Sequence, residues 1–237
     1  LCTPCSREGE VAAEVLYAAE QCGVDKIFKI GGAQAIAAMG YGTQTVPRVD
    51  KIFGPGNRYV TKAKQMLSVA DVAIDMPAGP SEVMVLADDS ADAAFVASDL
   101  LSQAEHGPDS QALLVCDNVR FAEQVERQLE RQLAALPRAG IASRALENSR
   151  AIVFDSKDDM ADFANAYGAE HLIISMHDAW EVADRITAAG SVFIGNYSPE
   201  SAGDYASGTN HTLPTCGWAS AFSGVNTDSF VRKITYQ

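Results

Sequence analysis

Gln103 and His106, three positions apart, carry side chains that could bind a divalent metal together. They lie at the end of a helix-like segment, Asp92 to Glu105, which Gly107 and Pro108 prevent from continuing. Side chains three residues apart leave the same face of a helix, so a carboxamide oxygen and an imidazole nitrogen would be offered together. The alternative is a histidine that only interacts with the helix dipole, so the pair needs further ligands to be informative.

A glutamate–histidine pair, Glu170 and His171, supplies candidate acid–base groups at the start of an apolar strand. Adjacent residues in an extended chain point to opposite faces, so the two can serve one site only at the mouth of the strand, where the backbone still turns. There His171 could take a proton from an alcohol while Glu170 activates water. The alternative is a surface glutamate beside a histidine that is packed in the core.

A long segment over 196–224, rich in Gly, Ser, Thr and Asn, is expected to be irregular. Such a long loop in a compact domain is usually functional. Within it, Asp204 offers a hard oxygen ligand for a metal, and His211 adds a titratable group. The alternative is a polar loop that contains an aspartate and a histidine by chance.

Two glycine-rich junctions, at 31–34 and 54–57, each follow a short predicted strand and precede a predicted helix. Glycines let backbone N–H groups approach a ligand, and the following helix N-terminus favours an anion such as a pyrophosphate. Neither junction matches GxGxxG, and ordinary tight turns are the alternative. Their recurrence at the carboxyl ends of successive predicted strands favours a cofactor cleft.

The elements that must position these residues alternate between helix and strand, which is typical of an α/β fold. The segment 76–81 holds two prolines and a glycine, and we expect a domain boundary there. Before it, the pattern predicts helices over 8–21, 35–39 and 58–68 and strands over 25–30, 49–53 and 72–75. After it, the pattern predicts strands over 82–87, 111–116, 151–154, 171–175 and 191–195 and helices over 91–105, 118–136, 158–167 and 178–188.

The bulk composition excludes several classes of protein. The net charge of −13 argues against nucleic-acid binding and suits a small cationic substrate. No apolar run is long enough to span a membrane. The five scattered cysteines, with one CxxC at Cys2 and Cys5, indicate reduced thiols and a cytoplasmic location rather than a zinc motif. The chain begins like the end of a strand, without an initiator Met or a signal peptide, so we expect a fragment.

Six motifs together resemble the histidinol dehydrogenase family. They lie in order over essentially the whole chain, at 31–37, 50–57, 75–82, 103–107, 169–172 and 203–211. The resemblance implies a zinc-containing, NAD-dependent homodimer. Such an enzyme oxidises L-histidinol to L-histidine through the aldehyde, in the last two steps of histidine biosynthesis.

The resemblance also implies a role for each candidate residue. His171 would take the hydroxyl proton during hydride transfer, and Glu170 would activate the water that attacks the aldehyde. The implied zinc ligands, which let the metal grip the imidazole and amine of the substrate, are Gln103, His106 and Asp204. The residues implied at the substrate, besides these ligands and His171, are Ser81 and His211. The residues implied at NAD are Gln34 and Asn57.

The implied fold has two Rossmann-like domains with largely parallel sheets flanked by helices, both incomplete in this chain. We expect an NAD-binding part over 1–79, a zinc and substrate part over 80–225, and the start of a C-terminal tail over 226–237. In the family, an N-terminal region and a helical tail complete the protein. That tail brings a further His ligand and a Glu to the neighbouring site of the dimer, so we expect the isolated chain to be inactive.

Three alternatives keep part of this interpretation. A related zinc and NAD dehydrogenase could act on another amino or hydroxy compound, and comparing histidinol with simple amino alcohols would separate the two. A non-catalytic fragment could bind a metal or ligand without turnover. A zinc hydrolase is disfavoured because the chain has no HExxH or similar helix.

Overall fold

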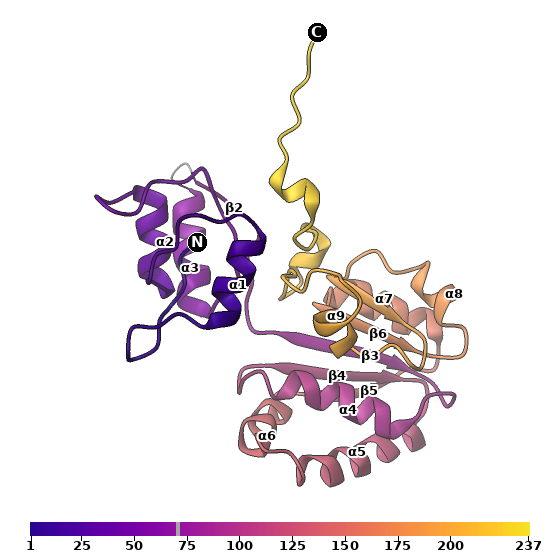
Figure 1. Cartoon of the computed structure of the whole chain (residues 1–237). Coiled ribbons are helices and arrows are strands. Elements are labelled where there is room, and N and C mark those ends of the chain that lie inside the picture. The colour runs from indigo at the N-terminus through magenta and orange to yellow at the C-terminus, as the bar shows by residue number, and fades with distance from the viewer. Residues whose placement is uncertain (70–71) are drawn as a thin grey trace. The chain divides into compact units, whose positions relative to one another are not determined.

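The chain, described over residues 1–69 and 72–237 in a computed structural model, folds into two compact units (Figure 1). These units are Leu1–Pro77 and Ala78–Gln237. The division lies within the proline-rich motif, two residues before the boundary expected after position 79. No helix in the described ranges is both long and apolar enough to cross a membrane.

The second unit is built on a sheet of five parallel strands in the order β5-β4-β3-β6-β7. The strands are β3 (Glu82–Ala87), β4 (Gln111–Cys116), β5 (Arg150–Val153), β6 (His171–Ser175) and β7 (Ser191–Ile194). The chain moves outward from β3 to β5, crosses back to place β6 against β3, and then moves outward again. This strand order is that of a doubly wound sheet, and it confirms the predicted α/β class.

Helices cover both faces of this sheet (Figure 1). In β3, Val83 and Val85 pack on the side of α4 (Ala93–Ala104) and α5 (Val119–Leu133). Their neighbours Met84 and Leu86 pack on the side of α7 (Lys157–Tyr167) and α8 (Ala179–Ala183). Because successive side chains alternate between faces, a strand that is covered on both sides must be apolar throughout. This requirement explains the continuous apolar runs of β3, β4 and β6.

The first unit holds a small parallel pair, β1 (Lys51–Ile52) and β2 (Ala73–Ile74). Its helices within the described residues are α1 (Ala13–Gln21), α2 (Gly32–Tyr41) and α3 (Arg58–Ser68). Ile36, Ile52, Leu67 and Val72 form its apolar core. A buried ion pair joins Lys64 to Asp75, and both residues also bind the backbone of Gly54. These contacts fix the second glycine-rich junction between β1 and α3.

Four predicted elements of the first unit are shorter in the structure, among them the strands expected over 49–53 and 72–75, which are limited to β1 and β2. The strand expected over 25–30 is reduced to a single bridge between Cys2 and Phe28. The helix expected from residue 8 begins at Ala13, because the Ser6 hydroxyl accepts the N–H groups of Glu8 and Glu10 and Gly9 has a φ of 82°. A local turn therefore replaces the first helical turn.

Two segments of the second unit contain helices that the sequence pattern does not predict. The helix α6 (Ala139–Glu147) occupies 139–147, where its Ala142 and Ala145 are fully buried against α4. The segment expected to be irregular over 196–224 contains the short helix α9 (Ser201–Tyr205) and a 3₁₀ turn, Trp218–Ser220. Both helices are short, so packing against the sheet layer decides them rather than their own periodicity. The helix expected over 178–188 is limited to α8, which ends at Ala183.

Candidate active site

Glu170 and His171 lie at the amino-terminal end of β6, beside the amino-terminal end of β3. Gly168, with a φ of 64°, ends α7 in the left-handed conformation, so the backbone turns immediately before the pair. His171 Nδ1 lies 3.7 Å from Glu170 Oε2, and each residue is only 6% exposed. Two adjacent side chains therefore serve one buried region at the mouth of the strand.

The Glu170 carboxyl is held by the start of β3. Its Oε2 accepts the Glu82 backbone N–H at 3.0 Å, and the Ser81 side chain also hydrogen-bonds to it. Burial raises the pKa of Glu170 from its ordinary 4.5 to about 8, and the nearby acids Glu82 and Glu200 act in the same direction. A carboxyl with this pKa can both hold and accept a proton near neutral pH.

The His171 imidazole has two different environments at its two nitrogens. Nδ1 lies 3.4 Å from the Glu82 carbonyl oxygen, and Nε2 lies 4.0 Å from Glu200 Oε1. A carbonyl oxygen only accepts, so the proton of the neutral ring belongs on Nδ1 and the lone pair on Nε2. Burial lowers the pKa of His171, which favours this neutral form. Nε2 is therefore the atom that can act as a base.

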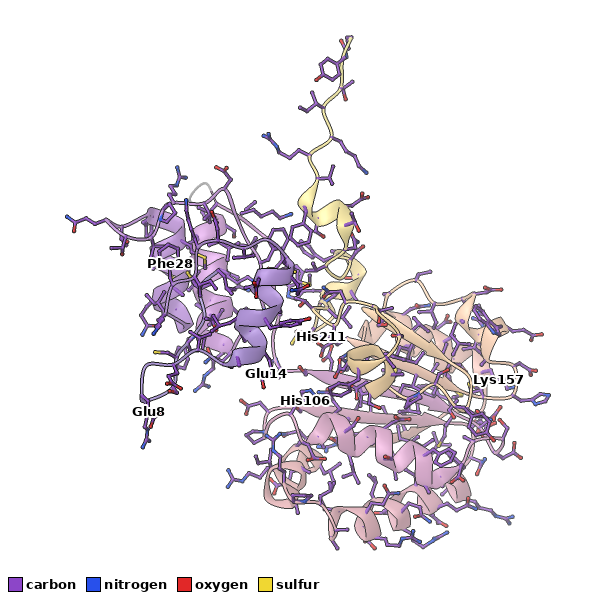
Figure 2. All side chains as sticks on the ribbon, viewed as in Figure 1. Glu8, Glu14, Phe28, His106, Lys157 and His211 are labelled. Carbon is purple, nitrogen blue, oxygen red and sulfur yellow. The ribbon has the colours of Figure 1, made fainter. Side chains whose placement is uncertain are left out.

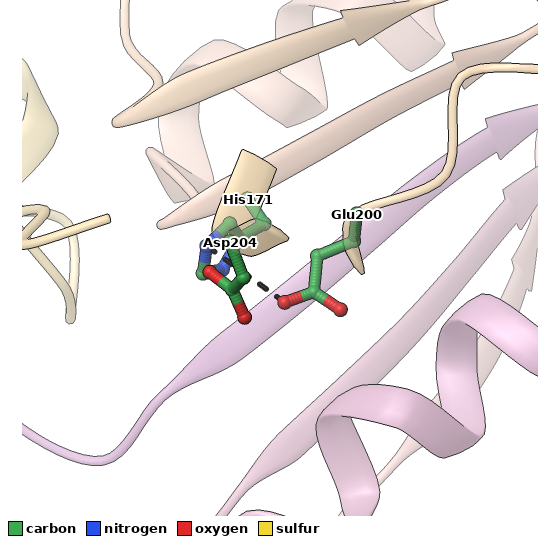
Figure 3. A group of neighbouring side chains, drawn as sticks. All are labelled: His171, Glu200 and Asp204. Atoms are coloured by element: carbon green, nitrogen blue, oxygen red, sulfur yellow. Dashed lines mark ion pairs between the residues drawn. The ribbon is translucent and has the colours of Figure 1, made fainter. Parts of the chain in front are cut away.

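Glu200, immediately before α9, is a buried carboxylate that the sequence interpretation does not include. It is 2% exposed, and its Oε2 accepts the Ser102 hydroxyl at 2.6 Å. Its Oε1 has no hydrogen-bond partner in the described part of the chain. Ligand atoms of His171, Glu200 and Asp204 lie within 4.8 Å of one another (Figure 3). The spacing of four residues between two acids, Glu200 and Asp204, is the signal that could have revealed it.

Gln103 carries a buried amide without partners among the described residues, which points to a ligand-binding role. Its side chain is fully buried in α4, yet neither Oε1 nor Nε2 has a hydrogen-bond partner among residues 1–69 and 72–237. A buried amide without partners is costly, so a native structure normally satisfies it. Gln103 follows Ser102, which binds Glu200, so α4 and α9 converge on this region. An unpaired amide oxygen, on the helix whose Ser102 hydroxyl binds Glu200, fits the donor chemistry of a zinc site.

His106 and Asp204 differ in how firmly the protein holds them. Asp204 is partly buried and belongs to the cluster with His171. His106 is exposed just beyond the end of α4 (Figure 2), with Nδ1 3.1 Å from the Ser102 carbonyl oxygen. Its charge is near enough to contribute to the lowered pKa of His171. The helix ends at Ala104, so His106 reaches this region from a turn rather than from the predicted helix face.

The two further residues expected at the substrate lie on segments that are tied together. Ser81 immediately precedes β3, and exposed His211 follows α9 (Figure 2). The loop after His211 returns to the start of β3, where Thr215 Oγ1 accepts the Gly79 N–H and the Cys216 N–H binds Glu82 Oε1 at 2.9 Å.

Gln34 and Asn57, the residues expected at NAD, each lie at a helix N-terminus in the first unit. Gln34 is exposed in the first turn of α2. Asn57 caps α3, and its Oδ1 accepts the N–H groups of Tyr59 and Val60 at 3.0 and 3.2 Å. Both are at positions that suit an anion, and their role at NAD stays a prediction.

The whole chain, residues 1–237, matches the family model described as histidinol dehydrogenase. It is 60% identical over 237 residues to a histidinol dehydrogenase of Bacteroides thetaiotaomicron, covering 100% of this chain and 55% of that protein. It is 55% identical over 239 residues to the one of Yersinia pestis, covering 100% and 53%. The crystal structure of histidinol dehydrogenase from Elizabethkingia anophelis superposes with a TM-score of 0.96 at 56% identity, over 100% of this chain and 55% of that one. The chain thus spans about half the length of the relatives it matches.

Proposed function

This chain belongs to the histidinol dehydrogenase family, and on that premise we propose that it carries most of the catalytic residues of an NAD-dependent, zinc-containing enzyme. The enzyme oxidises L-histidinol to L-histidine through L-histidinal, at the end of histidine biosynthesis. The observation that carries the proposal is the buried Glu170–His171 pair, which lies at one strand mouth with opposite pKa shifts.

In the first oxidation, His171 is the general base. Its Nε2 accepts the proton of the substrate hydroxyl while the carbon-bound hydrogen leaves as a hydride to the nicotinamide. The Glu82 carbonyl oxygen holds Nδ1–H, which keeps the ring in the tautomer with its lone pair on Nε2. The product is the aldehyde, and the imidazole now holds one additional proton close to the buried Glu200 carboxyl.

In the second oxidation, Glu170 activates water. Its deprotonated carboxylate takes one proton from a water molecule as the oxygen attacks the aldehyde carbon. His171 returns the proton it took in the first oxidation to the aldehyde oxygen, which completes the hydrate and frees Nε2. The hydrate then loses a second hydride to a second NAD while His171 takes the hydroxyl proton, and gives the carboxylic acid. The two residues therefore act in sequence on one carbon atom, which explains why they must share the mouth of one strand.

The residues that would hold zinc are Gln103, His106 and Asp204, and the unpaired amide of Gln103 supports this assignment. When bound, zinc supplies a fixed positive centre that grips the imidazole and amine of histidinol. Ser81 and His211 would add contacts to the substrate. Gln34 and Asn57 would line the NAD site. The net charge of −13 favours attraction of a cationic amino alcohol.

The remaining parts of the proposal concern the complete protein. We propose a cytoplasmic homodimer in which the partner's C-terminal tail completes each site with a His ligand and a Glu. This part is supported by the family membership. The isolated chain is accordingly proposed to be inactive.

A direct test uses a full-length enzyme that carries this sequence. NADH formation is measured on addition of histidinol, before and after a zinc chelator, and again after zinc is restored. We expect two NADH per histidinol, loss with the chelator, and recovery with zinc. Turnover of simple amino alcohols in place of histidinol would instead identify a related dehydrogenase, and zinc binding without NADH formation would identify a non-catalytic protein.

A further inference from the structure

Both candidate catalytic side chains are hydrogen-bonded to the backbone of one residue, Glu82. Its N–H donates to Glu170 Oε2 at 3.0 Å, and its carbonyl oxygen faces His171 Nδ1 at 3.4 Å. Glu82 is the first residue of β3, where the chain emerges from the segment of irregular backbone that contains Gly79 and Pro80. Its backbone position therefore sets the orientation of both groups.

The side chain of Glu82 is itself fixed from two directions. Oε1 accepts the Cys216 N–H at 2.9 Å, and Oε2 accepts the Tyr167 hydroxyl at 3.0 Å. That hydroxyl also lies 2.5 Å from Gln111 Oε1 at the start of β4. Glu82 is only 5% exposed, so each of these bonds forms away from competing water. The carboxyl thus joins the end of α7, the loop after His211 and the start of β3.

A second contact holds the same two segments together. Thr215 Oγ1 accepts the N–H of Gly79, three residues before Glu82. A Cβ placed at Gly79 would lie 2.6 Å from Cys216 Sγ, so the Cys216 side chain packs where only a glycine leaves room for it. The loop that carries His211 is therefore bound to the β3 start at two neighbouring points.

We propose that Glu82 is a positioning residue, which clamps the β3 start through Tyr167 and Cys216 and so aims Glu170 and His171 at the substrate. This inference rests on the proposed function for the roles of Glu170 and His171. Glu82 touches no reacting atom. Its contribution is the placement of two catalytic groups, because a displacement of about an ångström from the productive geometry costs roughly 100-fold in rate.

The positioning by Glu82 depends on hydrogen bonding and shape rather than on charge. Substitutions that keep or remove the hydrogen bonds can therefore test it. A glutamine at this position can accept the Cys216 N–H through its oxygen and donate its amide N–H to the Tyr167 oxygen. Tyr167 then donates its proton to Gln111, so every group keeps a partner. A leucine of similar size can make none of these bonds. Glu82→Gln should therefore rescue what Glu82→Leu loses.

The test uses full-length enzyme, with kcat expressed per bound zinc. Glu82→Leu is expected to lower kcat for histidinol roughly 100-fold, and Tyr167→Phe roughly five- to tenfold, with KM for histidinol and zinc content unchanged. Glu82→Gln is expected to stay within about threefold of the parent enzyme, well inside the range of a kept hydrogen bond. Tyr197→Phe, at a tyrosine that is 86% exposed, is the matched control and should have no effect. Tyr167→Phe removes one hydroxyl only, so it tests the clamp if the leucine variant fails to fold.

Three results would overturn the inference: full kcat in Tyr167→Phe, equal losses in Glu82→Gln and Glu82→Leu, or a fall in zinc content that parallels the fall in kcat. Crystal structures of the parent and Tyr167→Phe proteins give an arm that is independent of activity. Displacement of the Glu170 carboxyl from the N–H of residue 82 supports the clamp, and an unmoved carboxyl contradicts it. If the parent enzyme does not oxidise histidinol, only the proposed function is refuted. The crystal structures would still test whether Glu82 positions Glu170.

Discussion

Burial shifts the pKa values of the two candidate acid–base residues in opposite directions, and both side chains are therefore neutral. Removal from water disfavours any charged form, so it raises the pKa of Glu170 to about 8 and lowers that of His171. The 3.7 Å contact between them is therefore not an ordinary ion pair at neutral pH. A neutral imidazole is ready to accept a proton, and a protonated carboxyl close to its pKa is ready to lose one.

His171→Ala in the full-length enzyme should nearly abolish the first oxidation and leave the zinc content unchanged. The base contributes proton removal, which is worth roughly 10²- to 10⁴-fold, and it is not one of the proposed ligands. Single-turnover NADH formation from histidinol, together with metal analysis of the same sample, checks both parts. Loss of zinc from this variant would instead indicate that His171 is itself a zinc ligand. Its position close to Asp204 would then reflect shared metal binding.

Glu170 should give the aldehyde step a distinct pH dependence. The carboxylate form activates water, so the rate of histidinal oxidation should rise with pH and reach half its maximum near the pKa of about 8. Glu170→Gln should slow this step more than alcohol oxidation and remove its rise with pH. Stopped-flow assays with histidinol and histidinal, run separately across pH, make the comparison. Equal losses in both steps would argue against a water-activating role.

The same shift has a consequence for stability, with a defined sign. The folded pKa of Glu170 lies above its ordinary 4.5, so between these values the folded state binds more protons than the unfolded state. Its contribution to the free energy of unfolding is therefore fully present below about pH 4.5 and is lost as the pH rises through about 8. Between these pH values, the melting temperature should fall less steeply with rising pH in Glu170→Gln than in the parent protein. Parallel curves would show that Glu170 titrates normally.

At the scale of elements, the candidate site occupies the amino-terminal edge of the sheet, whereas open α/β sheets usually bind ligands at the carboxyl ends. The carboxyl ends of β3 and β6 are occupied by the protein's own hydrogen bonds. Asp88 accepts the N–H groups of His177 and Ser90, and Asn196 donates to the Ser90 carbonyl oxygen. At the opposite edge, the loops that follow α7 and α9 return to the start of β3, where Glu170 and Glu82 lie close together.

Gly190, immediately before β7, should be a sensitive point of this edge. A Cβ added there would lie 2.6 Å from the Glu170 carbonyl oxygen, a backbone atom that cannot move without displacing the start of β6. Gly190→Ala should therefore lower both oxidation rates by roughly tenfold or more, as misplacement of catalytic groups does. The control is Gly140→Ala in α6, where an added Cβ meets nothing within 4 Å. That variant should keep full activity and gain stability of about 0.5–1 kcal/mol; similar activities in the two variants would contradict the argument.

At the scale of the whole molecule, the chain has about half the length of the relatives it matches. Of the three proposed zinc ligands, one offers a nitrogen and none a thiolate, which is a weak set for zinc. Gln103 is rigidly buried, whereas His106 is exposed beyond its helix. Under the proposed zinc assignment, these three residues therefore need a further ligand to bind the metal tightly.

The isolated 237-residue chain should accordingly bind zinc weakly and show little or no histidinol oxidation. Adding the C-terminal segment of a full-length enzyme, in cis or as a separate peptide, should raise zinc occupancy and activity together. Metal analysis after dialysis and NADH assays measure the two quantities. Stoichiometric zinc in the isolated chain after dialysis would show that no tail histidine is required as a ligand.

The amino-acid sequence by itself determined the features that depend on local periodicity and on motif chemistry. The apolar runs of β3, β4 and β6 predict strands buried on both faces, and the structure confirms them at 82–87, 111–116 and 171–175. The six motifs predicted the family, which the comparisons confirm. These features can be predicted from the sequence because each depends on only a few consecutive residues.

Only the tertiary structure decided the contacts between residues that are far apart in the chain. Glu82 meets Glu170 across 88 positions and Cys216 across 134, and Glu200 meets Ser102 across 98. No local pattern distinguishes these acids from solvent-exposed ones, because their burial depends on the strand order and on the return of distant loops. Short helices such as α6 and α9 were decided in the same way, since a few residues gain helical stability only from packing against a neighbouring surface.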